Sequence, residues 1–283
     1  MGYKIIHFPC FKKHNSIFSK CKKNYITLVI SYNIKIILLL ILYFIEMSVT
    51  NLADIKHAFY INLEHRTDRN EHVSEQLTNL GLQGFERFNA IKMANGAIGC
   101  SMSHLKILQT ALQNNWDHVL IVEDDITFLD PVLFKTNFET FLQRNGNNWD
   151  VILLAGNNMP PYDTIDDVCI KVKRCQTTTG YLVNGHYIKK LMENVKMGLS
   201  HLIHKPASHA MYAIDKFWFL LQAVDRWFLI IPPTVVQRED YSDIEKKRTN
   251  YQKIMMDLDK KEMFDAIARA KQQNQMGKML NFR

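Results

Sequence analysis

Three consecutive carboxylates follow an apolar run in the middle of the chain. Residues 119–122 are Val-Leu-Ile-Val, typical of a strand buried in a parallel sheet, and they lead into Glu123, Asp124 and Asp125. Neighbouring acids repel one another unless a cation compensates them, and Mg²⁺ or Mn²⁺ prefers oxygen ligands. Strand alternation would place Glu123 and Asp125 on one side and Asp124 on the other. The triplet therefore predicts a metal site at a strand's carboxyl end; the alternative is an acidic turn that caps the next helix.

Two arginines three residues apart follow an earlier apolar run. Residues 58–63 read as a strand, and Arg66 and Arg69 stand where a helix would open. Together with the N–H groups of the helix N-terminus, they could hold a pyrophosphate. The alternative is a pair of solvated arginines that bind Asp68 or Glu64. The spacing alone favours that alternative.

Several other polar residues stand in mostly apolar or small-residue surroundings. Ser103 and His104 end the segment Gly-Cys-Ser-Met-Ser-His, which matches neither an esterase elbow nor a phosphate-binding glycine loop. A lone histidine at a helix start is more often a structural hydrogen-bonding residue than a catalyst. Asp215 is a single acid in a hydrophobic run. The segment that contains His201, His204 and His209 is predicted to be a loop rather than a metal site, because the spacing of these histidines fits no standard zinc motif.

Alternating strand-like and helix-like segments must position these residues. Apolar runs predict strands over residues 58–63, 85–90, 119–122, 149–155, 168–174 and 178–183, and a broken strand over 227–236. Helical spacing predicts helices from 67 or 68 to 80, from 101 or 103 to 112, from 131 onward, over 185–195, and from about 243 to near the end. This alternation predicts one α/β domain with a largely parallel sheet.

Positive charge is concentrated at the N-terminus of this 283-residue chain. The formal net charge is +7, but seven of the 35 Lys and Arg and only one of the 28 Asp and Glu lie in residues 1–46. The remainder is close to neutral, which argues against a nucleic-acid partner. Residues 25–45 are mostly apolar but contain Lys35, so the leader 1–46 is either a signal anchor or a dispensable extension.

The domain and compartment predictions follow from this leader and from the cysteines. We expect a working domain over residues 47–245 and a charged helical tail over 246–283. Five cysteines without a Cys-x-x-Cys pair indicate neither a disulfide framework nor a zinc knuckle, and a reducing compartment fits best. The predicted location is the cytoplasm, or the membrane surface if residues 1–46 are an anchor.

Taken together and in order, short motifs across residues 56–245 resemble glycosyltransferase family 25, which includes bacterial lipooligosaccharide galactosyltransferases and procollagen galactosyltransferases. The motifs are Tyr60-Ile-Asn-Leu63 with Arg66 and Arg69, Phe88-Asn-Ala90, Gly99-Cys-Ser-Met-Ser103-His104, Ile121-Val-Glu-Asp-Asp125, Trp149-Asp-Val-Ile-Leu153, Gly180-Tyr181-Leu182, Ile214-Asp215 and Ser242-Asp243-Ile244. The resemblance implies a GT-A-like, Rossmann-like α/β domain, a UDP-sugar donor, Mn²⁺ (or Mg²⁺), and inversion at the anomeric carbon.

The resemblance also assigns roles to particular residues. It implies that Glu123 and Asp125 bind the metal, supported by Asp124. Asp243, beside Ser242, would complete the metal or diphosphate site. The expected donor-binding residues are Asn62, Arg66, Arg69, Ser103, His104 and Asp124.

Inversion requires a base, and the chemistry leaves the acceptor open. Asp215 is our predicted base, since its apolar setting would raise the pKa of the carboxyl group. The donor would be UDP-galactose or UDP-glucose, and the acceptor a glycan, a lipid-linked sugar or hydroxylysine. The competing interpretations are a nucleotidyltransferase using the same acids and a catalytically silent carbohydrate-binding or interaction module.

Overall fold

The computed structural model describes residues 32, 34–37, 49–242 and 247–280, without the side chains of 242 and 271–280. Contacts divide the chain into two units, Met1–Ser48 and Val49–Arg283. The predicted leader over residues 1–46 lies almost wholly outside the described residues, so anchor or extension stays a prediction. Among the described residues, no helix combines the length and the hydrophobicity needed to cross a bilayer.

An eight-stranded sheet forms the centre of the second unit. Its order is β2 (Phe85–Asn89), β1 (Ala58–Asn62), β3 (His118–Glu123), β10 (Gly180–Asn184), β5 (Val151–Leu153), β11 (Trp227–Ile230), β8 (Cys169–Lys171) and β7 (Asp163–Thr164). Only β10 and β8 run against the other six strands. The predicted α/β class with a mostly parallel sheet is confirmed, and the sheet is mixed because of these two strands.

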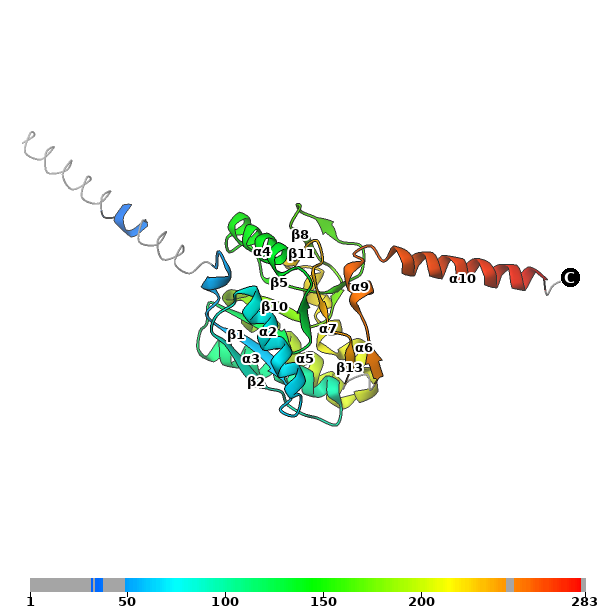
Figure 1. Ribbon diagram of the computed structural model, residues 1–283, viewed down its shortest axis with the longest axis horizontal. Helices are drawn as coiled ribbons and strands as arrows, with labels where there is room; N and C mark the ends of the chain where they lie inside the picture. The colour runs from blue at the N-terminus through cyan, green and yellow to red at the C-terminus, as the bar shows by residue number, and fades with distance from the viewer. Residues whose placement is uncertain (1–31, 33, 38–48, 243–246, 281–283) are drawn as a thin grey trace, which may run out of the picture. The chain divides into compact units, whose positions relative to one another are not determined.

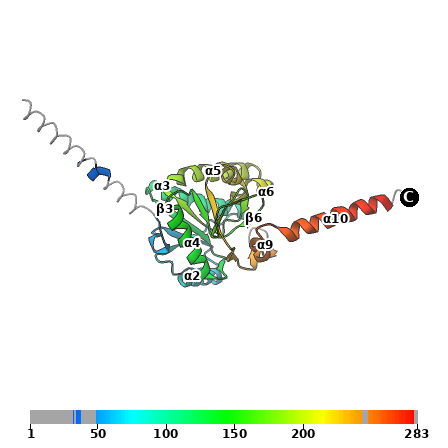
Figure 2. The same ribbon diagram turned by 90° about the horizontal axis from the view of Figure 1, so that it is seen from above.

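Helices cover both faces of the sheet, so the unit has three layers (Figures 1 and 2). One face packs against α2 (Thr67–Leu80) and α4 (Pro131–Asn145), which share a core with Leu120 and Val122. The other face packs against α3 (Gly96–Gln113) and α5 (Gly185–His204), which share a core with Val119 and Ile121. Alternate residues of β3 therefore pack into the cores on the two faces of the sheet, which is why β3 is apolar on both sides.

Two helix predictions need correction. The helix predicted from Ser101 or Ser103 begins earlier, because the side chain of Asn95 accepts hydrogen bonds from the amides of Ala97 and Ile98 and caps the helix there. The three histidines predicted in a loop lie at the end of α5 and in the short α6 (His209–Tyr212) instead. The helix α5 extends past residue 195 because its amphipathic pattern continues to Leu199 and Leu202, which are buried.

Smaller strand pairs and helices complete the unit. Three two-stranded pairs lie beside the main sheet: β12 (Val235–Gln237) with β4 (Ile126–Phe128), β13 (Asp240–Ser242) with β14 (Lys247–Thr249), and β6 (Asn157–Asn158) with β9 (Cys175–Gln176). Short helices are α7 (Ile214–Phe217), α8 (Phe219–Gln222) and α9 (Gln252–Met256), and α10 spans Lys261–Leu280; single 3-10 turns are η1 (Leu52–Asp54) and η2 (Pro206–Ser208). The predicted boundary after residue 245 falls between β13 and β14, which pair with each other.

A buried acid joins two parallel strands at their amino ends. Asp150, just before β5, accepts hydrogen bonds from the backbone N–H and guanidinium of Arg226, just before β11. His186 in α5 lies 2.7 Å from the same carboxylate. Burial alone would raise the pKa of Asp150, but these hydrogen bonds lower it below its usual value. This network fixes the end of the sheet opposite the site described next.

Candidate active site

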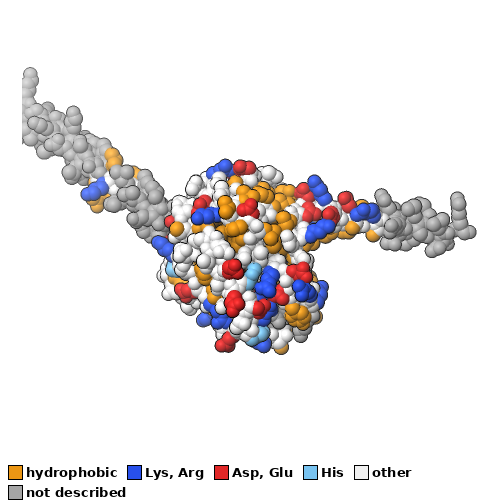
Figure 3. Space-filling view, viewed as in Figure 1, with side chains coloured by type: hydrophobic (Ala, Val, Ile, Leu, Met, Phe, Trp, Pro, Cys, Tyr) orange, Lys and Arg blue, Asp and Glu red, His pale blue; other side chains and the backbone are white. Residues whose placement is uncertain are grey.

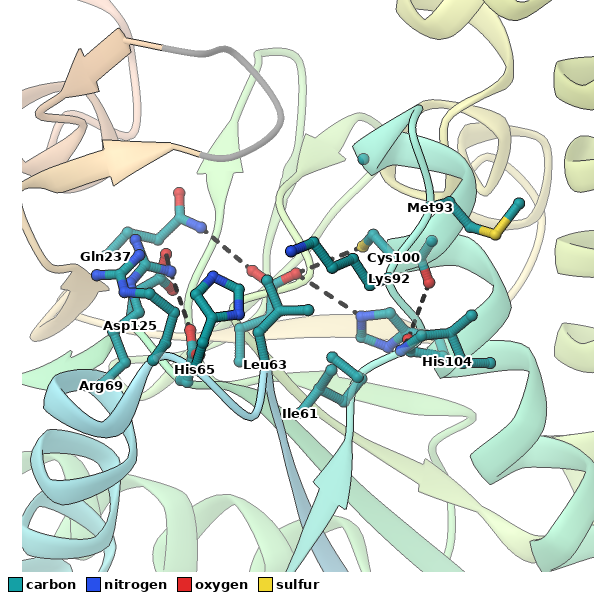
Figure 4. Close-up of a pocket in the computed structure, with 18 of the residues that line it drawn as sticks. Ile61, Leu63, His65, Arg69, Lys92, Met93, Cys100, His104, Asp125 and Gln237 are labelled. Atoms are coloured by element: carbon teal, nitrogen blue, oxygen red, sulfur yellow. Dashed lines mark hydrogen bonds and ion pairs between the residues drawn. The ribbon is translucent and has the colours of Figure 1, made fainter.

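The predicted site residues gather at the carboxyl ends of the neighbouring strands β1 and β3. A cavity of about 420 Å³ opens there, and Figure 4 shows the side chains that point into it. Its walls come from the end of β1, the start of α2, the loop before α3, α3 itself and the turn after β3. The cavity therefore lies where α/β folds place ligands, outside the carboxyl end of the sheet.

Asp124 is the centre of a buried charge cluster. One carboxylate oxygen accepts a hydrogen bond from Asn62 Nδ2 at 2.7 Å, and the other lies 2.9 Å from Nη1 of Arg69. Asn62 in turn accepts from Arg87 Nε at 3.0 Å, so its orientation is fixed. Burial raises the pKa of Asp124, and the contact with Arg69 lowers it in part. Asn62 does not line the cavity, because Asp124 lies between the Asn62 side chain and the cavity.

Both predicted arginines contact a second acid that the sequence analysis did not single out. Asp240, on β13, lies 2.6 Å from Arg66 Nη2 and 3.1 Å from Arg69 Nε. Arg66 also binds Asp68, as the solvated alternative predicts. Burial would raise the pKa of Asp240, but the Tyr241 amide and the two guanidinium groups hold it well below its usual range. The arginines thus tie the start of α2 to β13.

Asp125 is the acid of the triplet with the least compensation. Its Oδ2 lies 3.5 Å from Arg69 Nη1, whereas its Oδ1 is buried and has no hydrogen-bond partner among the described residues. Burial and the charge of Glu123 raise the pKa of Asp125 to about 8. A cation between these two carboxylates would relieve both the orphaned oxygen and the repulsion. The oxygen donors of Asp125 and Glu123 therefore fit the metal that the family resemblance implies.

Glu123 is held by residues from three other parts of the chain. Its Oε1 accepts from Thr178 Oγ1 at 2.7 Å, and its Oε2 accepts from Gln237 Nε2 at 3.2 Å. His104 Nε2 and Cys100 Sγ each lie 3.7 Å from Oε1 (Figure 4). Burial would raise the pKa of Glu123, but His104 and Thr178 hold it below its usual value. β3 ends at Glu123, and all three acids line the same cavity, so the predicted placement of Asp124 on the side opposite Glu123 and Asp125 is not observed.

Ser103 shapes a wall of the cavity. Its hydroxyl donates to the carbonyl of Gly99 at 2.8 Å and accepts from the amide of Ile91 at 2.9 Å. It thereby holds the loop before α3, which supplies Lys92 and Met93 to the cavity lining. His104 is fully buried, and its Nδ1 lies 2.8 Å from the hydroxyl of Tyr181.

A second cavity of about 830 Å³ adjoins the first. The two share Cys100, Glu123 and Gln237 as lining residues, and the second extends to Asp215 on α7. The amide of Thr177 and the ammonium of Lys216 each lie 3.2 Å from Asp215 Oδ2. The two described contacts of the Asp215 carboxylate are polar, whereas Ala213 and Ile214 beside it in sequence also line the second cavity. The surroundings of Asp215 are therefore mixed rather than apolar throughout as predicted.

Thr177 has an unusual backbone conformation beside Asp215. Its φ is 75°, in the left-handed region, where a β-branched residue is a true outlier. Its hydroxyl accepts from Thr179 Oγ1 at 3.1 Å. Strain of this kind persists only where the surroundings enforce it, and it is most common at functional sites.

Eight of the ten predicted site residues line one or both cavities: Arg66, Arg69, Ser103, His104, Glu123, Asp124, Asp125 and Asp215. Asn62 supports the site from behind Asp124, and Asp243 lies outside the described residues. The structure adds Asp240, Thr178 and Gln237 to the site. These residues lie far in sequence from the acids and arginines they contact, and nothing beyond their position in polar segments pointed to them. The functional roles of all these residues stay predictions.

Comparisons with known proteins agree on one family. Residues 92–211 match the family model of Glycosyltransferase family 25 (LPS biosynthesis protein). A "Glycosyltransferase 25 family member" of Anopheles gambiae is 26% identical over 171 residues, covering 49% of this chain and 28% of that protein. "Procollagen galactosyltransferase 1-B" of Xenopus laevis is 26% identical over 176 residues, covering 50% and 28%. The chain thus matches well under half of each relative's length.

One solved structure that the comparison matches is a glycosyltransferase involved in the glycosylation of the major capsid of PBCV-1. It is 13% identical, with a TM-score of 0.37, and the match covers 71% of this chain and 88% of that one. The assignment rests on the family model and on the relatives in sequence. Residues 92–211 are similar to glycosyltransferase family 25, so the family resemblance drawn from the ordered motifs is confirmed, and the predicted enzyme class agrees with the names of these relatives.

Proposed function

We propose that this protein transfers a hexose, galactose or glucose, from a UDP-sugar to an acceptor hydroxyl, with inversion and with a divalent metal. The observation that carries the proposal is the pair of adjoining cavities that meet at Glu123. One cavity holds arginines and acids suited to a nucleoside diphosphate, and the other holds a positioned carboxylate. Donor and acceptor can therefore meet where the two cavities adjoin, beside Glu123.

The first cavity suits the donor. Its apolar lining by Ile61, Leu63 and Ile91 offers a surface for the uracil ring, and Arg66 and Arg69 offer donors for the diphosphate. The N-terminus of α2 lies beside both arginines and adds its own positive end. As the bond to the sugar breaks, negative charge develops on the leaving diphosphate, and these groups stabilise it.

Glu123 and Asp125 would hold the metal, which supplies further neutralisation of the diphosphate when bound. The amide of Gln237 and the hydroxyl of Thr178 fix the Glu123 carboxylate, so that site is built before the metal arrives. Asp243 stays a proposed additional ligand.

Asp215 is the proposed general base. Both described contacts of its carboxylate use Oδ2, from the Thr177 amide and the Lys216 ammonium. That arrangement presents Oδ1 to an acceptor hydroxyl in the second cavity. The carboxylate would take the hydroxyl proton while the oxygen attacks the anomeric carbon from the face opposite the diphosphate. The second cavity also offers amide and hydroxyl groups from Asn157 and Thr178, which suit a polyhydroxylated acceptor.

UDP release tests the transfer itself. We expect release with Mn²⁺ and an added acceptor from UDP-galactose or UDP-glucose in a panel of UDP-sugars. Asp125→Ala should lose the Mn²⁺-dependent part of UDP binding in calorimetry. Binding of UDP without any turnover across donors and acceptors would instead favour the silent binding module.

Asp215→Asn tests the base. The variant should retain UDP affinity within a factor of about two while transfer falls by roughly 10²–10⁴-fold, the usual contribution of general acid–base catalysis. Asp167→Asn is a matched control, because Asp167 is an exposed acid that lines neither cavity. Full transfer by Asp215→Asn would remove this residue from the mechanism.

A further inference from the structure

Three potential metal ligands of different chemistry converge on the wall between the two cavities. They are the thiol of Cys100, the imidazole of His104 and the carboxylate of Glu123, and their ligand atoms all lie within 4.8 Å of one another. Cys100 lines both cavities, so a small ion can reach the group from solvent. Within the residues that the structure describes, no other such group of three is found.

Two of the three separations in this group are close to those of a tetrahedral zinc site. With zinc bonds of about 2.3 Å to sulfur, 2.0 Å to nitrogen and 2.1 Å to oxygen, neighbouring ligand atoms stand about 3.4–3.6 Å apart. The observed distances from Glu123 Oε1 are 3.7 Å to Cys100 Sγ and 3.7 Å to His104 Nε2. A shift of a few tenths of an ångström would bring both atoms to these separations from Oε1, and the thiol and the imidazole lie within 4.8 Å of each other.

His104 is oriented for coordination by its second nitrogen. Its Nδ1 lies 2.8 Å from the Tyr181 hydroxyl, in the manner of the outer hydrogen bond that fixes a metal-binding histidine. The His104 side chain is 0% exposed, and its Nε2 makes no hydrogen bond within the part of the chain that the structure describes; its carboxylate contact is Glu123 Oε1 at 3.7 Å. A buried ring nitrogen without a partner is costly unless something fills its place, and here it points at Glu123 and Cys100.

We infer that Cys100, His104 and Glu123 form a regulatory site for a zinc-class divalent cation, distinct in ligand chemistry from the proposed Mn²⁺ site. Sulfur and imidazole ligands select zinc-class over hard cations, whereas Asp125 supplies only oxygen. Binding releases the thiol proton of Cys100 to solvent, and the fourth position faces the cavity. The ion binds the Glu123 oxygen nearest His104. Glu123 is then no longer available as a ligand for the metal that binds the donor. Inhibition of transfer by the ion rests on the proposed function, whereas binding of the ion does not.

Metal binding is measured on the full chain without nucleotide, with Zn²⁺ in calorimetry and Co²⁺ in absorption spectra. Wild-type protein should bind one ion with a thiolate-to-cobalt charge-transfer band. Cys100→Ser should lose that band and bind Zn²⁺ at that site at least ~100-fold more weakly, since even outer partners contribute 10–100-fold. Cys169→Ala is the matched control, because it removes a thiol from the core and should leave the band unchanged.

Tyr181→Phe tests the orientation of His104. It removes only the hydroxyl and should weaken Zn²⁺ binding by roughly tenfold. Equal Zn²⁺ affinity in wild type and Cys100→Ser, or a Co²⁺ spectrum without a thiolate band, would overturn the inference. In UDP-release assays, Zn²⁺ should inhibit the wild type at concentrations at least tenfold lower than Cys100→Ser. If the wild type showed no Mn²⁺-dependent turnover, the proposed function would be refuted. The Zn²⁺ and Co²⁺ binding measurements would still decide whether the metal site exists.

Discussion

Gly99 stands where backbone from the neighbouring loop leaves no room for a side chain. A Cβ at this position would lie 2.4 Å from the carbonyl oxygen of Ile91 and 3.2 Å from the amide nitrogen of Met93. The loop cannot retreat freely, because the Ile91 amide donates to Ser103. We therefore expect Gly99→Ala to displace the loop that forms one wall of the proposed donor cavity.

Two effects of opposite sign decide the stability of Gly99→Ala. Alanine in place of glycine inside a helix favours folding by about 1 kcal/mol. Overpacking against backbone costs about 1–3 kcal/mol, and loss of the bond between Ile91 and Ser103 adds about 0.5–1.5 kcal/mol. The destabilising effects are larger, so the free energy of unfolding should fall by roughly 1–3 kcal/mol. Helix propensity alone predicts the opposite sign.

The measurement is urea unfolding followed by tryptophan fluorescence, together with UDP affinity by calorimetry. Gly198→Ala is the matched control in α5, where the new Cβ would meet the Phe217 ring at 2.9 Å. That ring lies on a side chain that can rotate, so we expect a smaller loss and unchanged UDP affinity. If Gly99→Ala were as stable as the wild type and bound UDP equally well, the steric reasoning would be refuted.

Three further predictions concern charge and strain. Asp150→Asn should lose roughly 2–3 kcal/mol at pH 7 in urea unfolding, since hydrogen bonds to charged groups contribute about this much. Because the pKa of Asp150 is lower in the folded state, its contribution is present above pH 3.8 and is lost as the pH falls through the lowered pKa, so the stabilities of wild type and variant should converge in that acidic range. Arg69→Met should destabilise the protein by about 3–5 kcal/mol, since it leaves buried acids unpaired, and added Mn²⁺ should recover more stability than in the wild type. Thr177→Gly should change stability by less than about 1 kcal/mol, because relief of strain offsets glycine's flexibility, yet it should lower transfer by freeing Asp215.

The strands were predictable because their pattern is local. The run before Glu123 is apolar on both faces, and β3 is buried on both sides of the sheet as expected. The start of α3 was not predictable in this way. Serine favours the first positions of helices, so the helix was predicted to begin at Ser101 or Ser103. Their hydroxyls instead donate back to the carbonyls of Ala97 and Gly99 inside the helix. The true cap, Asn95, precedes a glycine and therefore resembles a turn.

The acidic triplet was visible in sequence, but its partners were not. Arg69 contacts Asp240 from 171 residues away, and Gln237 contacts Glu123 from 114 residues away. No periodicity or local propensity carries such pairings, since they depend on how β13 and β12 return to the end of β3. The surroundings of Asp215 were predicted only in part, because one polar contact comes from its neighbour Lys216 and the other from the Thr177 amide, 38 residues away in sequence.

Charge balance among the acids indicates where a cation is required. Arg66 and Arg69 lie within 3.1 Å of Asp124 or Asp240, so these two carboxylates are compensated by the chain itself. Asp125 has only a 3.5 Å contact to Arg69 and a buried oxygen that finds no hydrogen-bond partner among the described residues, and the charge of Glu123 raises its pKa. The proposed divalent metal would therefore gain most by binding between Asp125 and Glu123, and a second ion held by the sulfur and nitrogen ligands beside Glu123 would compete for the same carboxylate.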